Sequence, residues 1–176
     1  MIDLDIKLNG VDEVLKQLNP KAFKQALNRT VNDMGMKMKT QMTKGVRKTY
    51  NIQARDVKRY MKVKRSRYDD MRYQIEINSE RRNVMRFGAK VLKKRGSVSV
   101  RIKKDKGRSI LRNSFVAKNG KAILHRVGKT QKIKAVQTVS IPQMFNKKIL
   151  QEADNMVTNE AGNKLKDNLA FYLGKG

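Results

Sequence analysis

The sequence predicts an α+β protein, in which a long N-terminal helix packs on a small antiparallel β-sheet and a C-terminal amphipathic helix follows. Apolar residues recur every three or four positions near both ends of the chain, and every second position between them. The 176 residues are enough for one domain with a substantial core. We therefore expect an α+β domain at residues 1–145 and a C-terminal amphipathic helix at residues 146–176.

The first predicted element is a strand at residues 2–8. The stretch IDLDIKL alternates apolar and charged side chains, which is the pattern of a strand with one buried face. Asn9-Gly10 then predicts a turn. Residues 11–18 can form a short helix, which ends at Asn19-Pro20 because the residue before a proline is disfavoured in the α conformation.

The longest predicted helix begins at Pro20, a residue that suits the first helical turn. Seven apolar side chains then follow at helical spacing: Phe23, Leu27, Val31, Met34, Met38, Met42 and Val46. Gly35 and Gly45 weaken a helix and therefore indicate close contacts with a neighbouring element. Asn51 is expected to cap a shorter second helix, and residues 61–65 are expected to return to extended chain.

The middle of the chain predicts a small antiparallel sheet. Tyr73, Ile75 and Ile77 alternate with polar residues, and further strands are expected at residues 97–102 and 123–127. A turn is predicted at residues 79–83, and Asn119-Gly120 predicts a hairpin between the flanking apolar stretches. From residue 146 apolar residues again follow helical spacing, so this terminal helix either completes the core or docks on another subunit.

Charge is the most informative feature of the composition. The chain carries 42 Lys and Arg against 15 Asp and Glu, a net charge of +27, which favours an anionic partner with nucleic acid as the first candidate. Residues 90–108 are expected to form a basic hairpin that contacts nucleic acid or an acidic partner, although the same lysines could simply keep a surface soluble. The contact residues would be Lys93, Lys94, Arg95, Arg101, Lys103, Lys104, Lys106 and Arg108.

The sequence offers little for catalysis, and we expect neither an enzyme nor a bound cofactor or metal. There is no cysteine, and His125 is the single histidine, so a basic nuclease would rest on that residue alone. The sequence lacks the nucleotide-binding, zinc-protease and serine-hydrolase motifs. It also lacks a signal-peptide pattern and any run of 18 apolar residues, so we expect neither export nor a membrane span.

Four stretches of the chain together resemble the phage and prophage minor tail protein Z family. They are ALNRT at residues 26–30, TYNIQARDVKRYMKV at 49–63, YQIEINSERRNVMRFGAK at 73–90, and SFVAKNGKAILHRVGKTQKIKAVQTVSIPQMF at 114–145. The resemblance implies a structural virion protein of a long-tailed phage. It also implies a small module in which a long helix packs across an antiparallel sheet.

The same resemblance implies a role in tail completion or head-to-tail joining, with a ring that caps the head-proximal end of the tail tube. The expected partners are other copies of the chain in a sixfold ring, the tail tube or tail terminator protein, a head connector or adaptor protein, and the end of the phage DNA. The expected location is the head-tail junction of the virion, after assembly in the host cytoplasm. No membrane partner is implied.

The neutral segment at residues 135–145 is the expected subunit or tail-tube interface. After a strongly basic region it contains no charged side chain, and Ile141, Pro142, Met144 and Phe145 would form the contact. The alternative is that this segment is a buried strand of the monomer, which Pro142 ends. An alternative hypothesis for the function of the whole protein is that it is a monomer that binds nucleic acid without sequence specificity.

Overall fold

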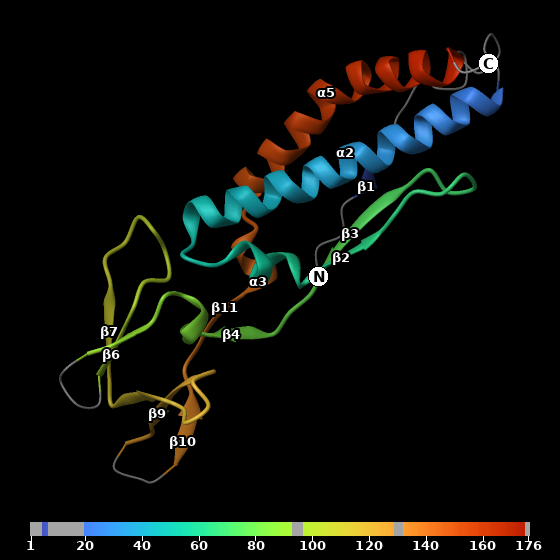
Figure 1. Cartoon of the computed structure of the whole chain (residues 1–176). Helices are drawn as coiled ribbons and strands as arrows, with labels where there is room; N and C mark the ends of the chain where they lie inside the picture. The colour runs from blue at the N-terminus through green and yellow to red at the C-terminus, as the bar shows by residue number, and fades with distance from the viewer. Residues whose placement is uncertain (1–4, 7–19, 93–96, 129–131, 175–176) are drawn as a thin grey trace. The chain divides into compact units, whose positions relative to one another are not determined.

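The computed structural model describes residues 5–6, 20–92, 97–128 and 132–174, and for residues 5–6 the backbone alone. The chain packs as two units (Figure 1). The first comprises residues 1–42, 61–77 and 147–176, and the second comprises residues 43–60 and 78–146. Long helices and small antiparallel sheets together confirm the predicted α+β class.

In the first unit, the residues that the structure describes form two long helices and one three-stranded sheet. Helix α2 (Pro20–Thr49) belongs to this unit as far as Met42, and helix α5 (Lys147–Leu173) follows much later in the chain. The antiparallel strands are β1 (Asp5–Ile6), β2 (Met61–Lys64) and β3 (Tyr73–Ile77), in the order β1-β3-β2. The short helix predicted at residues 11–18 lies outside the described residues.

Helix α2 forms as predicted, and one of its faces packs against the sheet. All seven apolar side chains of the predicted stripe are buried. A Cβ atom added to Gly35 would lie 2.2 Å from Cγ of Tyr73, so glycine is what allows the helix to approach strand β3 this closely. Asn32 adds a polar contact, because its side-chain amide donates to the carbonyl of Ser66 at 3.2 Å and its carbonyl accepts from the Ser66 N–H at 3.1 Å.

Helix α5 packs on α2 in the antiparallel direction (Figure 1). The buried Asn168 amide donates to Thr30 Oγ1 at 2.9 Å, and Lys37 Nζ lies 2.6 Å from a Glu160 carboxylate oxygen. Four apolar residues on one face of α5 are buried: Ile149, Ala153, Val157 and Ala161. The terminal helix therefore completes the first unit, which was one of its two expected uses.

Burial of Tyr73 predicts a pH dependence of stability. The residue is 1% exposed, and desolvation raises the pKa of its hydroxyl above the ordinary 10.0, with a smaller opposite effect from the Arg65 charge. The folded state therefore holds this proton more tightly than the unfolded state. Its stabilising contribution is complete below pH 10 and is lost as the pH rises further.

The measurement is the free energy of unfolding in urea for the native chain and for Tyr73→Phe, at pH 8 and at pH 11. Lysine titration affects both proteins alike, so the difference between them isolates Tyr73. We expect the native chain to lose more stability than Tyr73→Phe over this interval. Equal losses would show that this hydroxyl ionises as easily in the folded as in the unfolded chain.

The described residues of the second unit form short helices and three small antiparallel sheets. Its helical segments are α3 (Ala54–Lys58), the 3-10 turn η1 (Val84–Arg86) and α4 (Ile141–Met144). Its sheets, in strand order, are β11-β4, β5-β6-β7 and β10-β9-β8. The strands are β4 (Arg81–Asn83), β5 (Lys90–Val91), β6 (Ser97–Val100), β7 (Ser109–Arg112), β8 (Ser114–Val116), β9 (Ile123–Arg126), β10 (Ile133–Ala135) and β11 (Gln137–Ser140).

Two of these sheets and η1 share an apolar cluster, with Val84 from η1, Val98 and Val100 from β6, and Ile123 from β9. The predicted hairpin at Asn119-Gly120 is confirmed, with Gly120 at φ +67° between β8 and β9. The expectation of a single sheet in the middle of the chain is wrong, because these strands divide among several sheets.

Two local predictions fail because distant residues provide the hydrogen-bond partners. The turn expected at residues 79–83 is largely strand β4, which pairs with β11 more than 50 residues later. Helix α3 has Gln53 and not Asn51 at its N-cap. The Asn51 amide donates instead to the carbonyl of Phe87 at 3.3 Å.

Candidate functional site

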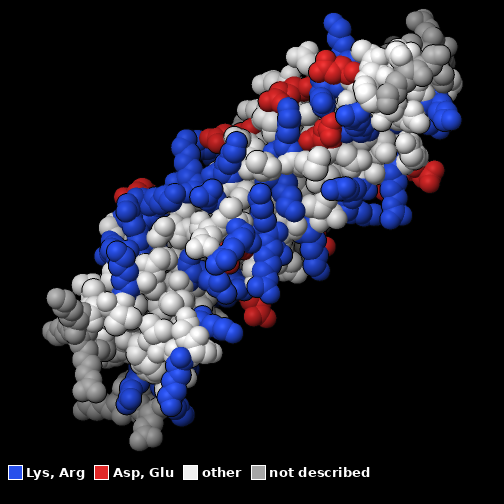
Figure 2. Space-filling view, in the orientation of Figure 1, with Lys and Arg blue, Asp and Glu red and all other residues white. Residues whose placement is uncertain are grey.

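The positive charge of the chain is concentrated in the second unit. Its segments contain 25 Lys or Arg and three acidic residues, so 25 minus 3 gives +22 of the chain's +27. The acidic residues are Asp56, Glu80 and Asp105. Lys and Arg outnumber acidic residues across the visible face in Figure 2. Few of these cations can be neutralised within their own unit, so the second unit is the candidate for contact with an anion.

The basic segment at residues 90–108 is not the single hairpin that was predicted. It spans strands β5 and β6 and continues to β7. Residues 101–108 join β6 to β7, so this basic group follows β6, whereas Lys93, Lys94 and Arg95 precede β6 in the sequence. Lys93, Lys94 and Arg95 themselves lie outside the described residues.

Both arginines of the connection at residues 101–108 bind backbone of the same unit. The Arg101 guanidinium donates to the carbonyls of Lys104 and Lys106. Arg108 donates to Oγ and the carbonyl oxygen of Ser99, at 2.6 and 2.8 Å, and to the carbonyl of Gly88 at 2.8 Å. These guanidinium groups therefore fix the loop, a role that the sequence pattern did not indicate.

The same loop is attached to the end of α2. The Lys104 N–H donates to the Thr49 carbonyl at 2.8 Å, and the Asn51 N–H donates to the Ile102 carbonyl at 2.8 Å. Lys103 Nζ lies 5.8 Å from the centroid of the Tyr50 ring. Of the predicted contact residues, Lys104 and Lys106 are the exposed lysines on this described loop.

The residues that were expected to anchor an exposed interface, at 141–145, are instead largely buried within the chain. Ile141 and Met144 are 0% exposed and Phe145 is 6% exposed, while Pro142 is half-buried. Within residues 135–145, strand β11 covers residues 137–140 and ends directly before the helical turn α4 at residues 141–144, so the alternative of a strand that ends near Pro142 is confirmed in part. The Ile141 N–H donates to Ser79 Oγ at 2.9 Å, which fixes the start of this turn. The neutral composition reflects burial of these apolar side chains.

Exposed apolar side chains lie instead on edge strands of the second unit. Val91 on β5 is 68% exposed, Ile110 on β7 is 62% exposed, and Ile133 on β10 is 51% exposed. Each of these strands is at the edge of its three-stranded sheet. Sequence reasoning missed these residues because single apolar residues in short basic strands have no periodic signal.

Comparison with known families agrees with the predicted resemblance. The sequence profile of prophage minor tail protein Z (GPZ) matches residues 5–175, nearly the whole chain. The chain belongs to this family. No curated protein and no solved structure matches it significantly. Family membership establishes a structural role in a phage tail and association with the virion.

The single histidine of this tail protein lies in the middle strand of one of its sheets. His125 lies on β9, opposite Ser114 of β8 and Lys134 of β10, and its buried Nδ1 finds no hydrogen-bond partner in the part of the chain that the structure describes. A general base needs a positioned partner, and neither residue opposite His125 is a carboxylate. Among the described residues there is also no group of acidic or histidine side chains that could hold a metal ion.

Within the described part of this minor tail protein, no helix is long and apolar enough to cross a membrane.

Proposed function

We propose that this tail protein completes the head-proximal end of the tail as an oligomeric ring and joins the tail to the head. The observation that carries the proposal is the match of the family profile to residues 5–175. The ring would consist of copies of this chain, six by the resemblance. Its neighbours would be the tail tube or tail terminator protein on one side and a head connector or adaptor protein on the other.

The edge strands of the second unit support a ring of this kind. An edge strand has backbone N–H and C=O groups that can pair with another chain. Strands β5, β7 and β10 add one exposed branched apolar side chain each: Val91, Ile110 and Ile133. Contact between different edges of neighbouring subunits is a head-to-tail interface, which closes into a ring when the rotation allows it.

The experiment is light scattering of the purified full chain, after nuclease treatment and in high salt, alone and mixed with tail tubes. We expect either a ring-sized species or capture of the chain at tube ends. The variant Ile133→Asp adds a charge at an exposed edge position and should reduce assembly without unfolding the chain. The matched control is Ile133→Val, which keeps an apolar side chain at the same edge position and should assemble like the native chain.

A chain that stays monomeric, ignores tail tubes and still binds DNA at low salt would overturn this proposal. That result would favour the alternative hypothesis, a monomeric nucleic-acid-binding protein. Assembly that is unchanged in Ile133→Asp would leave the ring but would exclude the β10 edge as its contact.

A further inference from the structure

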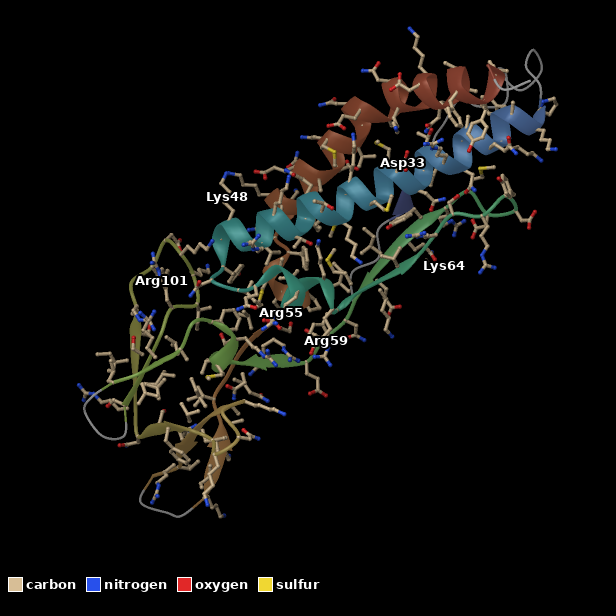
Figure 3. The ribbon with its side chains drawn as sticks, in the orientation of Figure 1. Asp33, Lys48, Arg55, Arg59, Lys64 and Arg101 are labelled. Carbon is tan, nitrogen blue, oxygen red and sulfur yellow. The ribbon has the colours of Figure 1, made fainter. Side chains whose placement is uncertain are left out.

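A second group of basic side chains surrounds helix α3, outside the basic segment at residues 90–108. Arg55, Lys58 and Arg59 are exposed on or next to this helix, and Figure 3 labels Arg55 and Arg59. Asp56 is the single acidic residue of α3. It lies 3.4 Å from Arg86 Nη1, so this carboxylate is already paired.

A cleft of about 300 Å³ lies beside α3, entirely within the second unit. Helix α3 and the residue before it contribute Gln53, Arg55 and Asp56. The chain from η1 to the start of β5 contributes Met85, Arg86, Gly88 and Ala89, and the β8–β9 turn contributes Gly120 and Lys121. The cleft therefore brings together three cationic side chains from segments far apart in the sequence, with one carboxylate.

Arg55 and Lys121 are not neutralised by any of the residues that the structure describes. No hydrogen bond or ion pair of the Arg55 or Lys121 side chain is found among the described residues, whereas Arg86 binds Asp56. At Gly120 an added Cβ would have no atom within 4 Å, so the turn beside Lys121 is open to an incoming group. Guanidinium and ammonium groups on the walls of an open cleft suit a phosphate, which accepts several charge-assisted hydrogen bonds.

Further cations of the second unit lie at the end of α3 and on β4. The Arg82 guanidinium lies 4.6 Å from the centroid of the Tyr60 ring, which holds it beside the residues that follow α3. The Tyr60 carbonyl accepts from the Asn78 N–H at 3.3 Å, which ties the end of α3 to the chain entering β4. Lys58, Arg59, Arg81 and Arg82 can therefore contact phosphates beyond the one in the cleft.

We propose that the cleft lined by Arg55, Arg86 and Lys121 binds a phosphate of double-stranded DNA, with the basic residues near α3 and β4 on the neighbouring phosphates. Duplex DNA carries one negative charge per about 1.7 Å of its axis. The second unit carries the opposite charge, a net +22, so many of its cations can pair with DNA phosphates. The site contacts the phosphate backbone of the DNA and not the edges of the bases, so it binds DNA without sequence specificity. It lies within one subunit and does not depend on ring formation.

The test is the affinity of the full chain for a labelled random-sequence duplex, measured by fluorescence anisotropy over a series of salt concentrations. The variant is Arg55→Gln with Lys121→Gln. The matched control is Arg67→Gln with Lys166→Gln, which removes the same two charges from exposed positions of the first unit. All four side chains are exposed, so both proteins should fold, which circular dichroism checks.

We expect the cleft variant to bind about tenfold or more weakly than the native chain at ~0.1 M salt. Its plot of log affinity against log salt should be shallower by about 1 to 2, because fewer phosphates are neutralised. The control should keep the native slope. A matching loss in both variants, or no binding by the native chain, would overturn the proposal. So would equal affinity for poly-glutamate, which would identify acidic protein as the partner.

Discussion

Replacing Gly35 by alanine is expected to destabilise the first unit by about 2–4 kcal/mol, although alanine is the better helix former. The new Cβ would lie 2.2, 2.3 and 2.5 Å from Cγ, Cδ1 and Cδ2 of Tyr73. These atoms belong to a ring that is 1% exposed and is close to its own backbone, so the ring cannot simply swing away. Helix α2 and strand β3 would have to separate, with loss of packing around them. Urea unfolding followed by circular dichroism measures the change.

Gly162→Ala is the matched control, because it makes the same substitution inside the other long helix. At Gly162 an added Cβ has no atom within 4 Å, so helix propensity alone decides the result. We expect a gain of about 0.5–1 kcal/mol. A second check is Tyr73→Ala, which removes the ring and should reduce the cost of Gly35→Ala. If Gly35→Ala were as stable as the native chain, the close approach of α2 to β3 would be wrong.

Ile141→Asp is expected to unfold the second unit, with a loss of about 4 kcal/mol or more in the free energy of unfolding. Ile141 is 0% exposed, so the variant loses a buried apolar side chain and places a carboxylate where water cannot reach it. Limited proteolysis and urea unfolding would detect the loss. This expectation differs from that of an exposed interface residue, whose substitution would stop assembly and leave the monomer folded.

Ile133→Asp provides the comparison for this effect. It makes the same chemical change in the same unit, at a side chain that is 51% exposed, so we expect a change in stability within about 0.5 kcal/mol. An Ile141→Asp chain that folds like the native protein but fails to assemble would contradict the buried position. It would place residues 141–145 at the interface that their neutral sequence predicts.

The elements that the sequence predicted well are those whose signal is local and repeated. Helix α2 carries seven buried apolar residues at helical spacing, and β3 alternates along its whole length, so burial of one face determines both. The β8–β9 hairpin depends on Asn119-Gly120, whose conformational preference is also local. Strand β4 was missed because its pairing with β11 depends on residues that are distant in the chain.

For the candidate site, too, the sequence predicted the features that depend on composition and residue order, and not those that depend on folding. Composition and charge order indicated an anionic partner and located the excess of Lys and Arg in the middle of the chain. They could not show that Arg101 and Arg108 bind backbone carbonyls, because these acceptors become available only when β6, β7 and the loop between them have formed. Composition and charge order also could not show that Arg55, Arg86 and Lys121 line one cleft, because these residues come from three separate segments of the chain.

The sequence by itself determined the α+β class, the two long helices, the family and the net charge of +27, since each depends on local periodicity, on residue order or on a simple sum. Only the tertiary structure decided which cations remain exposed and which neutral residues are interior. Ile141 is buried while Ile133 and Ile110 are exposed, although the three are the same amino acid. The physical reason is that exposure depends on what packs against a side chain, and those neighbours are brought there by folding.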